Sequence, residues 1–236
     1  FFSRLRAHVL RASAPLVPLT PKPHQLAVVE AAKNHYLDKQ NALGKLIMAC
    51  GTGKTLAAFW ITQAIGAQSI VVVVPSLALI KQNLSAWLRE IVAVGKFVNW
   101  LCVCSDDSVT AIDEDSLVSF TKDLGIPCST DSEYIAGWLN AHDDKPSIVF
   151  VTYQSGPTFS EAVAKASMTF AFGVFDEAHK TTGNQDKIFA HMLFDANLPI
   201  RQRLFMTATE RKYIGYSDRV ASMEHVATYG RTFYSL

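Results

Sequence analysis

Cysteine is scarce in this sequence, which limits the kinds of site it can build. The chain has four cysteines among 236 residues, at Cys50, Cys102, Cys104 and Cys128, and no two of them form a CxxC pair. Disulfide frameworks and cysteine-based metal centres rely on closely spaced, paired cysteines. Only Cys102 and Cys104 are near neighbours, on what we predict to be one strand, so neither a disulfide nor a metal role is expected.

Hydrophobic runs long enough to cross a membrane are also missing. The longest strongly apolar stretch, SIVVVVPSLALI, is shorter than the roughly 20 residues that span a bilayer, and Pro75 interrupts it. The N-terminus has neither the apolar core nor the cleavage signal of a secretory peptide. We therefore expect a soluble intracellular protein with no membrane partner. Because the chain begins with Phe and not Met, we also expect it to be a piece of something longer.

Charge of one sign is missing from two segments. No acid precedes Glu30, although the first 22 residues carry four Lys and Arg residues. Between 106 and 144, ten acidic residues accompany a single lysine, while the net charge of the whole chain is only +1. Phosphate backbones would repel such a segment. A solvated loop or surface helix with no partner is the simplest explanation of this acidic block.

The chain divides into an arm and a series of alternating strands and helices. The proline-rich stretch RASAPLVPLTPKP cannot form a regular helix, so we predict an extended arm or linker over 1–22. Beyond it, β-branched and aromatic runs alternate with segments of helical spacing. Strands are predicted at 45–49, 69–75, 99–105, 147–153, 170–176 and 203–209, and helices at 24–37, 55–65 and 77–94.

This alternation defines the expected fold class. The run SIVVVVP is continuous and β-branched, which is typical of a strand buried on both faces of a parallel sheet. Strands joined by helices require right-handed crossovers, and these predict an α/β fold with a doubly wound, mainly parallel sheet. At 236 residues we expect one domain with additions rather than two.

The stretch LIMACGTGKTLAAFW places a strand, a glycine-broken turn and a helix back to back. Glycines let successive backbone amides turn inward, the helix N-terminus adds partial positive charge, Lys54 can reach terminal phosphates, and Thr55 can ligate Mg²⁺. The usual pattern GxxxxGK[ST] has a glycine where this chain has Met48. A solvated lysine at a helix start is the alternative. The predicted phosphate-binding residues are Cys50, Gly51, Thr52, Gly53, Lys54 and Thr55.

A second element follows the strand in FAFGVFDEAHK. Asp176 and Glu177 come directly after the apolar run, where the crevice of an open α/β sheet lies. We expect Asp176 to hold Mg²⁺, commonly through water, and Glu177 to orient or deprotonate an attacking water. Adjacent acids are usually surface charges, and a lone histidine such as His179 is usually structural. Combined with the phosphate-binding turn, however, they predict ATP hydrolysis.

The wording of these motifs resembles a known family. ACGTGKT at 49–55, DEAH at 176–179 and TAT at 207–209 follow one another in the order seen in the first RecA-like domain of superfamily 2 helicases and translocases. The resemblance covers 23 to about 211, and implies a RecA-like P-loop NTPase domain over 23–236 with ATP and Mg²⁺ as cofactors. It implies catalytic roles for Lys54, Asp176, Glu177 and His179.

Further residues take roles through the same resemblance. PKPHQ is similar to the segment in which a glutamine, here Gln25, recognises adenine; a polar residue that only opens a helix is the alternative. MTATE resembles motif III, which implies that Thr207 and Thr209 link His179 and the ATP site to nucleic acid, unless they merely end a strand. VPSLALIKQ and VTYQS resemble motifs Ia and Ib, which implies backbone contacts from Pro75, Ser76, Leu77, Gln82, Thr152, Tyr153 and Ser155. Helix capping is the alternative for motif Ia.

Longer phrases point to a branch of the family. FDEAHKTTG, STDSEYIAGWL and YGRTFYSL look most like motor subunits of restriction, phage-defence or viral systems, which are chiefly double-stranded DNA translocases. This implies a nucleic-acid partner, with double-stranded DNA favoured, in the cytoplasm of a bacterium or of a host cell. An ATP-gated sensor or clamp, an RNA helicase, and a scaffold with vestigial catalysis are the alternatives. The intact acid pair argues against the last of these.

The chain departs from the family pattern after motif III. Only 27 residues follow Thr209, too few for the second RecA-like domain that carries an arginine finger. We expect that domain in the parent chain or in a partner, and slow hydrolysis without it. The acidic block, at about 106–144, is predicted to be an elaboration between motifs Ia and Ib that folds away from DNA. The arm is interpreted as a tether to an upstream domain, with a backbone-binding strap as the alternative.

Overall fold

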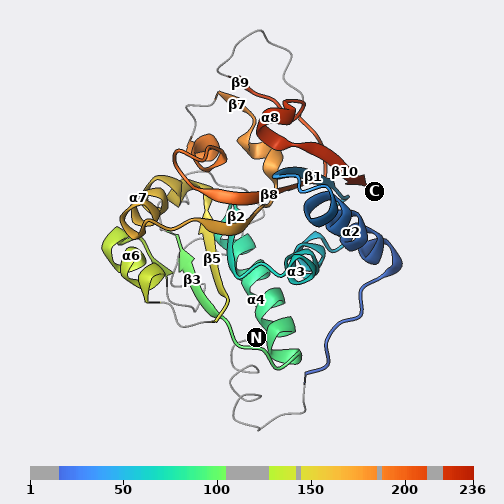
Figure 1. Ribbon diagram of the computed structural model, residues 1–236, viewed down its shortest axis with the longest axis horizontal. Coiled ribbons are helices and arrows are strands. Elements are labelled where there is room, and N and C mark those ends of the chain that lie inside the picture. Colours follow the sequence, from blue (N-terminus) through green and yellow to red (C-terminus); the bar gives the residue numbers. More distant parts are fainter. Residues whose placement is uncertain (1–15, 105–127, 142–144, 185–187, 212–219) are drawn as a thin grey trace.

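The structure is a computed structural model that describes residues 16–104, 128–141, 145–184, 188–211 and 220–236 (Figure 1). Its centre is an eight-stranded sheet whose neighbouring strands are all parallel, in the order β10-β1-β8-β6-β2-β5-β3-β4. The strands are β1 (Leu43–Ile47), β2 (Ser69–Val74), β3 (Asn99–Val103), β4 (Cys128–Ser129), β5 (Ser147–Thr152), β6 (Phe170–Phe175), β8 (Ile200–Thr207) and β10 (Arg231–Ser235).

Helices cover both faces of the sheet, as a doubly wound fold requires. Figure 1 shows α6 and α7 to one side of the strands and α3 and α4 to the other. The first face carries α2 (Pro23–Lys33), the π-helical turn η1 (Asn34–Asp38), α3 (Lys54–Ile65) and α4 (Leu77–Ala93). The second carries α6 (Ser132–Asn140), α7 (Gly156–Ala166), the 3₁₀ turn η5 (Ile188–Leu193) and α8 (Val226–Tyr229).

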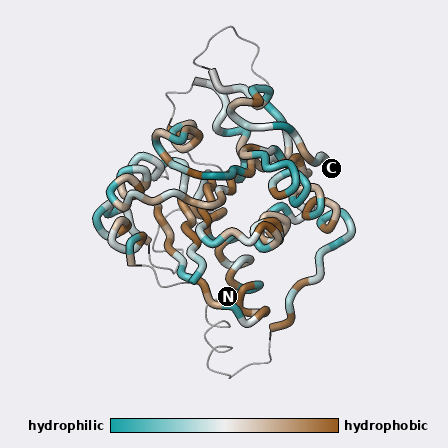
Figure 2. The backbone as a smooth tube through the Cα atoms, in the orientation of Figure 1, coloured by the Kyte–Doolittle hydropathy of each residue, from teal (hydrophilic) through white to brown (hydrophobic). Residues whose placement is uncertain are grey.

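The core is divided into two layers by the sheet itself. Successive side chains of a strand point to opposite faces, so Ile70, Val72 and Val74 pack with α2, α3 and α4, whereas Val71 and Val73 pack with α6 and α7. Figure 2 shows the hydrophobic strands in the interior and more hydrophilic residues along the outer helices. A strand buried on both faces needs an apolar residue at every position, which explains the unbroken SIVVVV run.

The fold class predicted from the sequence is confirmed. All six predicted strands exist, with ends that differ by at most three residues from the predicted ranges, and α3 and α4 begin and end within a residue of the predictions. The predicted helix at 24–37 is divided into α2 and the π-helical turn η1. Two edge strands, β4 and β10, were not predicted, because the first has two residues and the second is largely exposed.

Two other sequence features lie partly outside the described residues. From residue 16 onward the arm is docked on α4: the backbone N–H of Leu19 donates to Glu90 Oε2 (3.0 Å), and Arg89 Nη2 donates to the carbonyl of Val17 (3.1 Å). Of the acidic block, α6 lies in the described part, whereas 105–127 and 142–144 lie outside it. The role of the arm as a tether and the folding of the acidic block away from DNA stay predictions.

All four cysteines are free thiols. Within the described ranges, no helix combines the length and apolar character needed to cross a membrane.

Candidate active site

Three loops that the sequence singled out meet at one edge of the sheet. β1, β8 and β6 are neighbours, and their carboxyl ends lead into residues 48–53, residues 207–209 and the acid pair of Asp176 and Glu177. Parallel strands end at the same edge, and open α/β sheets form their ligand crevice there. Residues 48–53 are called the glycine loop below.

The glycine loop turns with two glycines in the left-handed region. Gly51 has φ 77° and Gly53 has φ 87°, conformations that other residues adopt only at a cost. Met48 stands where the usual pattern has glycine, but its backbone N–H donates to the carbonyl of Thr207 (3.0 Å) and its side chain is fully buried. Met48 therefore extends the strand and joins the core, and the turn begins after it.

Two side chains of α2 lie at hydrogen-bond distance from the glycine loop. The backbone carbonyl of Thr52 lies 3.2 Å from Gln25 Nε2 and 3.1 Å from His24 Nε2. Gln25 is buried, and its Oε1 accepts from the backbone N–H of Lys22 (2.9 Å). The Gln25 amide is thus tied to the loop and to the start of its own helix, and its role toward adenine stays a prediction. His24 is a contact that sequence reasoning missed.

Lys54 is the first residue of α3 and bends back over the loop. Its Nζ donates to the carbonyl of Met48 (3.2 Å) and lies 4.0 Å from Glu177 Oε1. The thiol of Cys50 is exposed at the turn, while the hydroxyl of Thr52 donates to Ala49 O (2.7 Å) and closes the loop. A cation therefore lies between the loop and the acid pair, as phosphate binding requires.

Asp176 is a buried carboxyl at the end of β6. Its backbone N–H donates to Val73 O (2.9 Å), and its Oδ1 accepts from the backbone N–H of Glu177 (3.0 Å). Burial raises the pKa of Asp176 to about 6, the charge of Glu177 adds to the shift, and Lys54 opposes it. A carboxylate in this position gains from a nearby cation. A carboxylate and a hydroxyl are oxygen ligands of the kind that Mg²⁺ prefers, and the metal-binding roles of Asp176 and Thr55 stay predictions.

Glu177 has an uncommon backbone conformation and two polar neighbours. Its φ of 49° and ψ of 43° are left-handed, a region that non-glycine residues seldom adopt. Its Oε2 lies 3.2 Å from His179 Nδ1. That hydrogen bond holds the pKa of Glu177 below its usual value, although burial opposes the shift. Glu177 is therefore ionised at neutral pH and able to accept a proton.

A chain of hydrogen bonds continues from Glu177 to motif III. Nδ1 of His179, in the 3₁₀ turn η4 (Ala178–Thr181), lies 3.0 Å from Thr207 Oγ1. The Thr207 hydroxyl donates to Thr209 O (2.8 Å) and accepts from the backbone N–H of Thr209 (3.2 Å). Because the hydroxyl proton is used, the Thr207 oxygen can only accept from His179, so the ring proton is on Nδ1. Thr207 and Thr209 are thus connected to His179, as predicted for the ATP-site side of their role, and the predicted link to nucleic acid stays a prediction.

The motif Ib side chains are directed into the protein. Thr152 ends β5, and its hydroxyl donates to Ser155 Oγ (3.0 Å). The Tyr153 hydroxyl donates to the carbonyl of Asp176 (3.0 Å), and all three residues of the motif are buried. β5 lies within the sheet, covered on both faces, and in η3 (Tyr153–Ser155), which directly follows it, Tyr153 and Ser155 are buried while Gln154 is half-buried. Their phosphate contacts stay a prediction.

Motif Ia is divided between the core and the surface. Pro75 and Leu77 are buried, whereas Gln82 is exposed on α4. Ser76 caps α4, where its Oγ accepts from the backbone N–H of Leu79 (3.4 Å). The capping alternative is therefore present for Ser76, and of these four side chains Gln82 is the most accessible to a ligand.

The parallel sheet with helices on both faces defines a RecA-like α/β domain, and the site carries the motifs of superfamily 2 helicases. The chain belongs to the family described as Type III restriction enzyme, res subunit, whose model matches residues 18–212. This family assignment confirms the resemblance noted in the sequence and relates the domain to restriction-enzyme motors.

Individual relatives agree with the family. A probable helicase of African swine fever virus is 28% identical over 185 residues, which are 77% of this chain and 19% of that protein. The Type ISP restriction-modification enzyme LlaGI, in complex with a DNA substrate mimic, is 28% identical with a TM-score of 0.71. The ATP-dependent Type ISP enzyme LlaBIII, bound to DNA, is 26% identical with a TM-score of 0.72.

The coverage of these structures is unequal. The LlaGI match spans 92% of this chain and 20% of that one, and the LlaBIII match spans 93% and 15%. The chain thus spans at most about a fifth of the length of these relatives.

Proposed function

We propose that this chain is the ATP-binding and ATP-hydrolysing half of a motor that tracks double-stranded DNA. The observation that carries the proposal is the continuous set of contacts from Lys54 through Glu177 and His179 to Thr207. It places a phosphate-seeking cation, an ionised carboxylate and motif III within one connected site. Membership of a restriction-motor family and the DNA complexes of the Type ISP relatives support the same function.

The proposed roles follow from the contacts of each residue. The left-handed glycines turn the loop amides toward an anion. Lys54 makes one hydrogen bond, to the carbonyl of Met48, and lies 4.0 Å from Glu177, so it can exchange these contacts for a terminal phosphate. Asp176 and Thr55 would hold Mg²⁺, which supplies positive charge to the phosphates. Glu177, kept ionised by His179, orients a water and accepts its proton. Gln25 is expected to contact adenine.

Full activity is proposed to need a second RecA-like domain. Its arginine finger would stabilise charge on the transferred phosphoryl group. The larger size of the relatives provides room for that domain and for others. Motor action then follows if ATP closes the two domains on DNA and hydrolysis opens them, in the cytoplasm of a bacterium or of an infected host cell.

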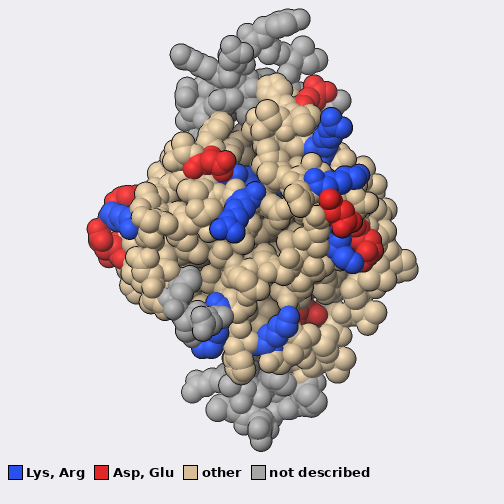
Figure 3. Space-filling view, viewed as in Figure 1, with Lys and Arg blue, Asp and Glu red and all other residues tan. Residues whose placement is uncertain are grey.

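DNA contact is proposed to be local rather than spread over a basic face. On the face shown in Figure 3, Lys and Arg side chains are interspersed with Asp and Glu, and most of the surface is uncharged. We expect Ser76, Gln82 and nearby amides of motifs Ia and Ib to contact the DNA phosphate backbone. Such contacts position a strand without reading its sequence. Such contacts suit a motor that must move past every sequence.

The test is ATP hydrolysis by the full-length protein with duplex DNA, single-stranded DNA, RNA or no nucleic acid. Glu177→Gln serves as the blank, because it keeps the shape of the side chain and removes the charge that accepts a proton. Stimulation by duplex DNA that the variant lacks is expected. Stimulation of ATP hydrolysis by RNA alone would mean that the substrate is RNA and not DNA. A rate of hydrolysis that no nucleic acid changes would overturn the proposal.

A further inference from the structure

A buried cation lies in β1, directly before the glycine loop. The side chain of Lys45 is 7% exposed, and its Nζ donates to Glu210 Oε1 (2.6 Å) and to the carbonyl of Met223 (2.6 Å). A buried ammonium is tolerated only when its charge and its donors are paired. Lys45 therefore fixes Glu210 and Met223 to the strand that carries the nucleotide site.

Glu210 joins this cation to motif III and to the edge strand β10. It directly follows Thr209, which is bonded to Thr207 and through it to His179. Its Oε1 also accepts from the hydroxyl of Thr232 in β10 (3.2 Å). One carboxylate oxygen thus connects β1, the motif III loop and β10, three segments that are far apart in the sequence.

A second connection runs from the DEAH turn to the same C-terminal stretch. The hydroxyls of Thr181, in η4, and Tyr229, in α8, lie 2.8 Å apart, and both residues are buried. Just beyond η4, β7 (Gly183–Asn184) pairs antiparallel with β9 (Val220–Ala221). The motif III loop and the turn after Glu177 are therefore both connected to residues 220–232.

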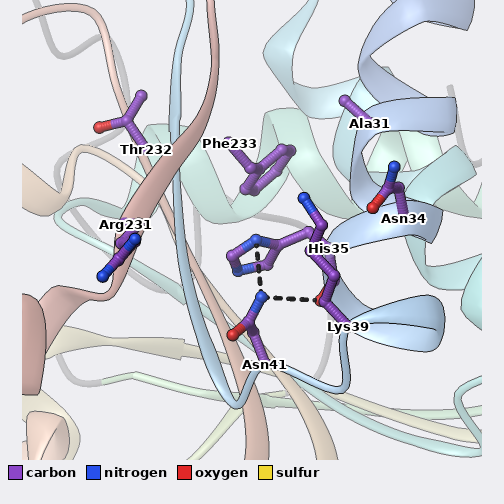
Figure 4. A pocket seen from close by; sticks show the side chains of 8 residues that line it. All are labelled: Ala31, Asn34, His35, Lys39, Asn41, Arg231, Thr232 and Phe233. Carbon is purple, nitrogen blue, oxygen red and sulfur yellow. Dashed lines mark hydrogen bonds between the residues drawn. The ribbon is translucent and has the colours of Figure 1, made fainter.

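The strand that receives these contacts, β10, lies at the edge of the sheet. The ladder between β1 and β10 is irregular after Lys45, where Phe233 is the additional residue. Phe233 stacks on His35, with ring centroids 5.0 Å apart, beside a cavity of about 440 Å³ between β10 and the end of α2 (Figure 4). Figure 4 shows Arg231 and Thr232 on the β10 side of this space. An edge strand beside a cavity can move at less cost than a packed one.

We propose that Lys45 and Glu210 are positioning residues that transmit the state of the nucleotide site to residues 222–235. The inference rests on the proposed function, because it needs ATP to bind at the glycine loop. When Thr207 and Thr209 shift with His179, Glu210 must follow the chain. Separating Glu210 from Lys45 would leave a buried charge unpaired, so Met223 and Thr232 move with the pair.

The test is hydrogen exchange by the full-length protein, with and without a non-hydrolysable ATP analogue and Mg²⁺. In the wild type, the analogue slows exchange in both 48–55 and 222–235. In Lys45→Met, protection of 48–55 remains while the response of 222–235 falls by about fivefold or more, the lower end of typical couplings between sites. Glu210→Gln keeps the hydrogen bonds and removes only the charge, so it gives a smaller loss in the same direction.

Controls separate coupling from folding and from the proposed function. Lys33→Met removes an exposed lysine of an ion pair on α2 and leaves the response of 222–235 unchanged. Unchanged exchange without nucleotide shows that each variant is folded. No wild-type response at 48–55 would overturn the proposed function. A response at 48–55 with none at 222–235, or a Lys45→Met response equal to that of the wild type, would overturn the coupling role alone.

Discussion

The carboxyl of Asp176 is buried where a charge is costly, which makes stability depend on pH. Its pKa is about 6 in the folded chain against 3.8 ordinarily, so the folded chain holds this proton more tightly than the unfolded one. The wild type therefore loses stability as pH rises from about 4 to about 6, and stays at the lower level above that range.

Asp176→Asn should remove this dependence in metal-free buffer. Its Oδ1 still accepts from Glu177 N–H, so at pH 8 we expect the free energy of unfolding to exceed that of the wild type by up to about 3 kcal/mol. Near pH 4 the difference should vanish. Urea unfolding with EDTA at both pH values measures it, and an equal difference at both would contradict the assignment.

Lys54 should matter for binding and little for stability. Its ammonium donates one hydrogen bond to a carbonyl (3.2 Å) and lies 4.0 Å from a carboxylate, so Lys54→Ala should lower the free energy of unfolding by the worth of about one hydrogen bond, roughly 1 kcal/mol. Titration with a fluorescent ATP analogue should show at least about tenfold weaker binding. Lys33→Ala, on the surface of α2, is the control. Wild-type affinity in Lys54→Ala would refute the phosphate role.

Single residues were predictable where a local pattern defined their position. Lys54 and Asp176 each mark a junction between a strand and the segment after it, and the structure places both at the crevice edge. His24 and Lys45 were not found, because their partners are 28 and 165 residues away in the sequence. Contacts over such separations are set by the packing of elements, which no local spacing encodes.

At the scale of elements, the glycine loop offers a matched pair of substitutions. A Cβ on Gly51 would meet nothing within 4 Å, so Gly51→Ala should cost only the left-handed backbone, about 1 kcal/mol. A Cβ on Gly53 would lie 2.4 Å from Gln25 Nε2 and displace the amide that holds Thr52. Gly53→Ala should therefore cost more, about 2–3 kcal/mol in all.

Chemical unfolding of the two variants decides this point. Truncation of the side chain in Gln25→Ala/Gly53→Ala removes the clash, so the added cost of Gly53→Ala over Gly51→Ala should shrink in that background. Equal losses for the two single variants would show that Gln25 does not clamp the loop.

Elements were predictable to the extent that burial imposed a pattern. β2 and β5 are covered on both faces, and their continuous apolar runs identify them. β10 is an edge strand with exposed or half-buried residues, so it has no such run, although it completes the sheet beside β1. Thr152 and Tyr153 are buried at the carboxyl end of β5, which the motif Ib phrase does not indicate, and their predicted phosphate contacts stay a prediction.

For the whole molecule, the chain is expected to be an incomplete ATPase. Residues 16–236 should bind ATP and Mg²⁺ but turn over about 10³-fold or more slowly compared with the full-length protein on DNA, because an arginine finger contributes roughly 10³ to 10⁵ in rate. Phosphate release at matched concentrations measures the ratio. Equal turnover by the monomeric fragment would contradict the need for a second domain.

Movement along duplex DNA is the proposed activity of the full-length protein, and displacement of a DNA triplex measures it directly. A labelled third strand is placed downstream on a linear duplex, and the full-length protein is added with ATP. Displacement of the third strand is expected to require ATP hydrolysis and to be abolished by Lys54→Ala and by Glu177→Gln. ATP hydrolysis stimulated by duplex DNA without any displacement would contradict translocation and leave an ATP-gated clamp.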